Sequence, residues 1–196
     1  RSRDTDRHLR ALPRGLVRLI PMPRSDEIQQ YLFATWHMMT GKPDAIRMLD
    51  LSAEGFWDSF FAIIIAIPAL FVSWVTVAND IGGGGTTGDR ISILFGLAFV
   101  DLVSWVAPLV VLGLVARYIG IGDRFVHYVV ATNWASAIVI WLMVPPGIIQ
   151  LFWPQAEAFA LALSLGLIAL TLVLMWRVTN AAIAKGPGVA TGVFVG

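Results

Sequence analysis

Residues 91–116, ISILFGLAFVDLVSWVAPLVVLGLVA, are the stretch that decides the fold of this chain. As a helix the stretch is long enough to cross about 30 Å of hydrocarbon, and it contains a single charged residue, Asp101, near its centre. A charged side chain at that depth costs at least about 2.5–3.5 kcal/mol on insertion scales, so it needs a partner or a function. The stretch therefore predicts a transmembrane helix that carries a polar site.

The composition of the whole chain agrees with a membrane protein. Of the 196 residues, 57% are hydrophobic and only 14% are charged, and the mean hydropathy is +0.75. These values are too apolar for a soluble domain of this size and indicate a polytopic membrane protein. The sequence contains no cysteine, which excludes disulfides, thiol catalysis and thiolate metal sites.

Residues 52–178 contain four stretches that are long and apolar enough to span a bilayer. We therefore expect an all-α fold, a bundle of four transmembrane helices preceded by an N-terminal amphipathic surface helix. Pro68 and Pro108 should kink the first and second helices, because proline removes a backbone hydrogen bond. The predicted spans are about 54–78, 91–116, 124–144 and 155–177.

Two segments after the second span are expected to lie outside the helices. Consecutive prolines end helices, so Pro145 and Pro146 should close the third span and leave residues 147–154 as an apolar interfacial loop. Residues 179–196 are expected to form a short glycine-containing tail, either a half-inserted segment or the start of a further element.

The residues before the first span divide into two parts. Residues 1–24 are basic and irregular, with seven arginines and three prolines, and we expect a poorly structured extension without the apolar core of a signal peptide. Residues 25–51 are expected to hold cytoplasmic helices, of which 25–40 is amphipathic. That helix either lies on the membrane surface or packs on the cytosolic ends of the protein's own helices. Its apolar face is predicted to include Ile28, Tyr31, Leu32, Trp36 and Met39.

Small residues in the fourth span follow helical rows four residues apart. Such rows let helix backbones approach closely in lipid, and we expect them to serve packing within the bundle, with a dimer face as the alternative. The two rows are Ala156, Ala160 and Ser164, and Ala158, Ala162 and Gly166.

The basic residues predict the orientation of the chain. With four spans, thirteen of the fourteen Lys and Arg residues fall on one side of the membrane and one, Arg90, falls on the other. By the positive-inside rule, both termini are expected in the cytoplasm of a bacterial inner membrane.

Comparison of depths along the antiparallel spans predicts a polar cluster near the bilayer midplane. Asp101 has two interpretations: a proton or substrate relay, as in transporters, or a protonated group that is hydrogen-bonded to Asn133 and holds helices together. The predicted members of the cluster are Asp101, Ser104, Asn133, Ser136 and Ser164.

No other constellation in the sequence indicates catalysis or a cofactor. His37 and His127 are expected to be interfacial polar residues rather than ligands of a haem or pigment, because no H-x-x-x-H or H-E-x-x-H pair exists. We find no metal site, nucleophile–base pair or phosphate loop, and expect that the chain is not an enzyme. Trp74 and Trp105 are expected to be packing residues, and Trp141 to lie at an interface.

The segments LDLSAEGFWDSFF (49–61) and ATNWASAIVIWLMVPP (131–146) resemble a group of small inner-membrane proteins of alphaproteobacteria. Those proteins are loosely similar to the Yip-type integral membrane domain. The resemblance covers roughly residues 25–185, and its clearest marks are Asp50, Gly55-Phe56-Trp57, Pro108 and Asn133-Trp134. It implies scaffolding or membrane-shaping interactions rather than catalysis.

Two functional hypotheses follow from these observations. The first is a non-enzymatic interaction protein: a scaffold, accessory subunit or assembly partner of a membrane complex. Its expected partners are the lipid bilayer and other integral membrane proteins or a second copy, with no nucleic acid and no cofactor. The second is a small transporter or channel component that uses Asp101 and Asn133.

Overall fold

The structure is a computed structural model that describes residues 23–81 and 86–195, and every regular element in these ranges is a helix. Four helical segments in the described part are long and apolar enough to cross a membrane, as predicted: Ala53–Asn79, Thr87–Val115, Gly122–Phe152 and Pro154–Ile183. Almost all of the predicted extension 1–24 and residues 82–85 of the first turn lie outside the described residues.

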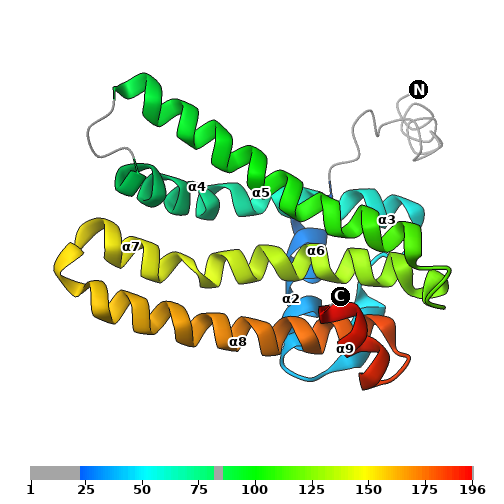
Figure 1. The fold of residues 1–196 in the computed structure, drawn as a ribbon. Helices are drawn as coiled ribbons and strands as arrows, with labels where there is room; N and C mark the ends of the chain where they lie inside the picture. Colours follow the sequence, from blue (N-terminus) through cyan, green and yellow to red (C-terminus); the bar gives the residue numbers. More distant parts are fainter. Residues whose placement is uncertain (1–22, 82–85, 196) are drawn as a thin grey trace, which may run out of the picture.

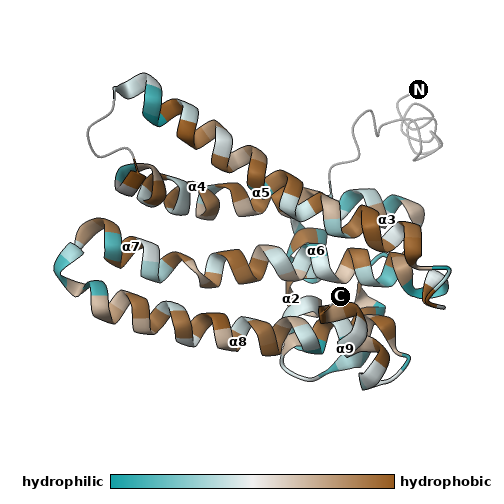
Figure 2. Cartoon of the chain, viewed as in Figure 1, coloured by the Kyte–Doolittle hydropathy of each residue, from teal (hydrophilic) through white to brown (hydrophobic). Residues whose placement is uncertain are grey.

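The long helices run side by side and change direction at each turn (Figure 1). Apolar residues cover most of their length, and hydrophilic residues gather near their ends (Figure 2). The short elements α2 and α9 lie at the same end of the bundle as the turn between α5 and α6 (Figure 1). In order, the long helices are α4 (Phe61–Ile81), α5 (Thr87–Val115), α6 (Phe125–Leu142) and α8 (Glu157–Ile183), with the shorter α7 (Val144–Phe152) between the last two.

Helix α6 is the centre of the core. Trp134, Ala131 and Ala135 are each at most 1% exposed, and α2 (Ser25–Met39), α4 and α8 pack against this helix. Alanines at successive turns keep the neighbouring backbones close, while the indole of Trp134 fills the space at the α2 side, where its ring lies 5.3 Å from that of Tyr31. Burial at this end of the bundle therefore fixes α2 on the protein.

The predicted apolar face of α2 is only partly turned toward the protein. Tyr31 and Met39 are buried, and Ile28 and Leu32 pack at the edge of the core, but Trp36 is 43% exposed. These contacts correspond to the alternative in which the helix packs on the protein's own helix ends. A place for the helix at the membrane surface stays a prediction.

The helix α3 (Ala53–Asp58) precedes α4 and begins at a tight junction. Ser52 accepts a hydrogen bond from the Gly55 N–H at 3.1 Å, and the carboxylate of Asp50 accepts one from the Ser52 N–H at 2.9 Å. A Cβ at position 55 would overlap the backbone of Asp50, so only glycine allows this approach.

The predicted loop over residues 147–154 is wrong. Residues 144–152 form α7, and Pro145 and Pro146 lie in its first turn, where a helix has no use for the missing N–H groups. Met143 closes α6 by donating its N–H to the carbonyls of Val139 and Ile140, each at 3.1 Å. The proline pair thus starts a second helical segment that prolongs the third span.

The predicted tail, 179–196, is also largely helical in the described part. Helix α8 extends to Ile183, six residues beyond the predicted end of the span, and α9 (Pro187–Val195) folds back on α8. The indole N–H of Trp176 donates to the Thr191 hydroxyl at 3.0 Å, and the Lys185 ammonium donates to the Gly120 carbonyl and to Asp123. The end of the chain is thereby tied to the turn between α5 and α6.

Helix α5 is attached more loosely than the other long helices. Although it has 29 residues, none of them is buried, and it diverges from α6 and α8 toward its N-terminus (Figure 1). Its Thr86–Asp89 capping box explains why it begins at Thr87 rather than at the predicted residue 91.

Candidate functional site

Asp101 lies on α5 and is bonded to an indole from the preceding span. The Nε1–H of Trp74, on α4, donates to Asp101 Oδ2 at 2.6 Å. This distance is short for a hydrogen bond between an N–H donor and an oxygen acceptor. No described residue donates to the other carboxylate oxygen, and no ion pair of Asp101 is present in the described ranges.

Asn133 lies on α6, is 1% exposed, and joins three helical segments through its amide. Its Oδ1 accepts the Nε1–H of Trp105, on α5, at 3.0 Å. Its Nδ2 donates to the Ser59 hydroxyl at 2.9 Å, and that hydroxyl donates to the Phe56 carbonyl at 2.7 Å. The chain of bonds satisfies the buried amide and links α5, α6 and the α3–α4 junction.

The hypothesis of a direct hydrogen bond between Asp101 and Asn133 is therefore wrong. Asp101 and Trp105 are four residues apart and lie one turn from each other on the same side of α5. Asp101 meets α4 through Trp74, whereas Trp105 meets α6 through Asn133. The two polar groups are neighbours with separate partners.

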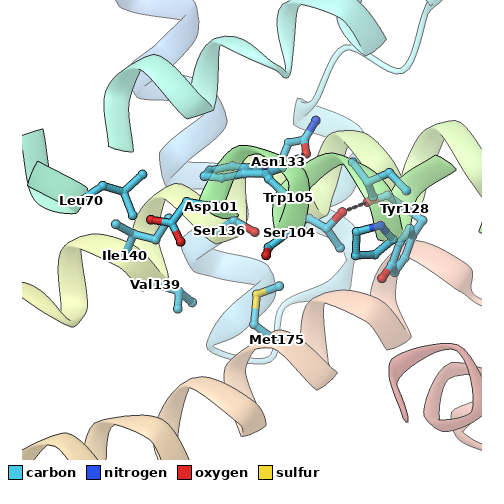
Figure 3. A pocket seen from close by; sticks show the side chains of 13 residues that line it. Leu70, Asp101, Ser104, Trp105, Tyr128, Asn133, Ser136, Val139, Ile140 and Met175 are labelled. Carbon is cyan, nitrogen blue, oxygen red and sulfur yellow. Dashed lines mark hydrogen bonds between the residues drawn. The ribbon is translucent and has the colours of Figure 1, made fainter. Parts of the chain in front are cut away.

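Both groups line one cavity of about 390 Å³. Ser104 and Ser136 also line it, so four of the five predicted members of the cluster share this space (Figure 3). The wall is built from α4, α5, α6 and α8, with Leu70 on α4 and Met175 on α8. It is mainly apolar, with the polar side chains of α5 and α6 set into it.

Ser164 does not belong to this cavity. It lines a separate cavity of about 280 Å³ together with Pro146 and Gly147 of α7, and its hydroxyl donates to the Ala160 carbonyl of its own helix at 2.9 Å. The prediction grouped Ser164 with the cluster by its depth along the span. In the structure, the rotation of α8 about its axis points this side chain toward α7.

Three tryptophans assigned to packing or to an interface each make a polar contact between spans. Besides Trp74 and Trp105, Trp141 on α6 donates its Nε1–H to the Ile65 carbonyl at 3.0 Å, within one turn before Pro68, which lies inside α4. One signal was available in the sequence: Trp105 and Asn133 are equidistant from Ile119 in the turn between their helices. Antiparallel helices place such residues at equal depth.

The two histidines do not form a shared site with other ligands. His37 Nδ1 lies 2.9 Å from the Phe33 carbonyl oxygen of its own helix, and His127 Nδ1 is buried without a hydrogen-bond partner. No group of three or more His, Cys, Asp or Glu side chains that could hold a metal ion occurs among the described residues.

No protein-family model, curated protein or solved structure matches this chain. The resemblance to Yip-type proteins stays a prediction.

Proposed function

We propose that this chain is a non-enzymatic interaction protein of the bacterial inner membrane, an accessory subunit or assembly partner of a membrane complex. Its resemblance to Yip-type scaffolding proteins supports this function, as does the absence of a nucleophile–base pair in the sequence. The observation that carries the proposal is an outward-facing row of small residues on α8.

The two small-residue rows of α8 have different environments. Ala160, in the first row, is fully buried, whereas Ala158, Ala162 and Gly166, in the second, are all exposed. No atom lies within 4 Å of a Cβ placed on Gly166. Lipid imposes no need for small side chains, but a second helix does, because its backbone can approach closely only there.

The occupant we assign to this row is a transmembrane helix of a second integral membrane protein. A symmetric dimer through α8 would cover the row but leave α5, which has no buried residue, uncovered. A larger partner can contact both helices. The surface end that holds α2, α9 and the basic turn residues Arg117 and Arg124 would then face the cytoplasm by the positive-inside rule.

Cysteine cross-linking tests the proposal directly, because the sequence contains no cysteine. A photoreactive thiol reagent on Ala162→Cys should link the 21.4 kDa chain to another protein in native membranes. The control is Ala160→Cys, on the same helix but 0% exposed, which should give no adduct. An adduct between two copies of this chain would show self-association instead of a different partner protein. The absence of any adduct would mean that the row faces lipid.

A second candidate function is transport, favoured by the cavity with a carboxylate within the span. A transport assay on Asp101→Asn, run beside the cross-linking of Ala162→Cys in the same background, separates the two candidates. An interaction protein keeps its adduct, since Asn can still accept the Trp74 hydrogen bond. A relay would lose transport with the adduct unchanged.

A further inference from the structure

The cavity around Asp101 is lined by four helices of this chain and is open on one side, where Ser104 and Pro108 are exposed. Its walls come from α4, α5, α6 and α8 (Figure 3). Its volume of about 390 Å³ falls within the range of small-molecule sites, about 300–1,000 Å³. A ligand of modest size can therefore lie between the helices.

The cavity has an acidic side chain in its wall but no basic one among the described residues. Asp101 offers a carboxylate oxygen that no described residue contacts, while its other oxygen is held by Trp74. No Lys, Arg or His is among the described residues that line the cavity. A carboxylate in this position is costly unless a cation or a proton neutralises it, and the protein supplies no cation there.

The remaining walls suit the body of an organic cation. Trp105 and Tyr128 contribute aromatic rings, and Met175 contributes a polarizable thioether. Aromatic rings attract quaternary and protonated amines through their π-systems. The hydroxyls of Ser104 and Ser136 also reach the cavity, and neither has a side-chain hydrogen bond in the described part of the chain.

We propose that this cavity binds a small organic cation, a quaternary or protonated amine with an apolar body, whose charge pairs with Asp101. A free metal ion does not fit the site, because one carboxylate and apolar walls provide too few oxygen ligands. A neutral lipid chain would fill the volume but leave the carboxylate without a counter-charge. The inference does not rest on the proposed partner interaction.

Binding of benzyltrimethylammonium to the purified full chain in detergent tests this site. The radiolabelled cation should bind saturably, and neopentylbenzene, which has the same shape without the charge, should displace it poorly. Asp101→Asn should weaken binding by about tenfold or more, which corresponds to about 1.4 kcal/mol. Asp89→Asn, on the same helix but in the exposed capping box at its N-terminus, should bind like the parent chain.

Each arm of this experiment can overturn the proposal. Equal displacement by the cation and by neopentylbenzene would show an apolar site without charge recognition, and this comparison needs no variant. Equal binding by Asp101→Asn, with an unchanged elution profile and circular dichroism, would remove the carboxylate from the site. Failure of either arm leaves the cross-linking of Ala162→Cys unaffected, so the two proposals fail separately.

Discussion

At the scale of single residues, three indole N–H groups make polar contacts between spans, beside the Asn133–Ser59 hydrogen bond. Trp74, Trp105 and Trp141 each donate to an oxygen on a different helix: a carboxylate, an amide and a backbone carbonyl. An indole has one donor and a large apolar body, so it can satisfy one acceptor in a membrane interior without adding an unpaired group. This chain therefore pairs its intramembrane acceptors mainly with tryptophan.

Trp105→Phe should lower the stability of the protein by about 1 kcal/mol, within the range measured for interhelical hydrogen bonds in membranes. The substitution keeps an aromatic ring but leaves Asn133 Oδ1, on a residue that is 1% exposed, without its donor. Thermal unfolding in detergent measures the effect. Trp153→Phe is the control, because that side chain is 60% exposed. Equal unfolding temperatures for both variants would contradict the importance of the bond.

The sequence could predict that several polar residues lie near one another, but it could not predict their hydrogen-bond partners. Counting residues from the ends of the spans placed Asp101, Ser104, Asn133 and Ser136 at similar depth, and these four residues line one cavity. It failed for Ser164 because depth does not determine the rotation of a helix about its axis. The count also missed Trp74, because the sequence does not show whether an indole only packs or also donates to an acceptor on another helix.

At the scale of helices, the positions of the helix ends differ most from the sequence prediction, because local backbone chemistry determines where a helix begins and ends. The pair Pro145-Pro146 was interpreted as a terminator, yet proline fits the first turn of a new helix equally well. Hydropathy likewise ended α8 near residue 177, whereas the structure continues it to Ile183, where packing against α9 replaces lipid contact.

The end of α8 allows a test of this local chemistry. Ala184 adopts φ 50°, a left-handed conformation, which costs an L-residue about 1 kcal/mol and costs glycine little. Ala184→Gly should therefore raise the free energy of unfolding by about 0.5–1 kcal/mol. Ala169→Gly, at an exposed position inside α8, should lower it by a similar amount. Two shifts of the same sign would contradict the assigned conformation.

At the scale of the whole molecule, the two ends of the bundle differ in charge and in structure. Arg117, Arg124 and Lys185 lie at the end that also carries α2 and α9, and Lys185 is paired there with Asp123. Arg90, at the start of α5, is the basic residue nearest to the opposite end in the described part of the chain. By the positive-inside rule, the end with these three basic residues is predicted to face the cytoplasm.

Single cysteines at the two ends test this orientation. Gly88→Cys lies at the start of α5, where a Cβ meets only ordinary contacts, and Tyr118→Cys replaces a side chain that is 90% exposed. A membrane-impermeant maleimide added to intact cells with a permeabilised outer membrane should label position 88. Position 118 should react only after the inner membrane is opened, because thirteen of the fourteen basic residues are then on the cytoplasmic side. The reverse pattern would contradict the predicted orientation and would place α2 and α9 on the side opposite the cytoplasm.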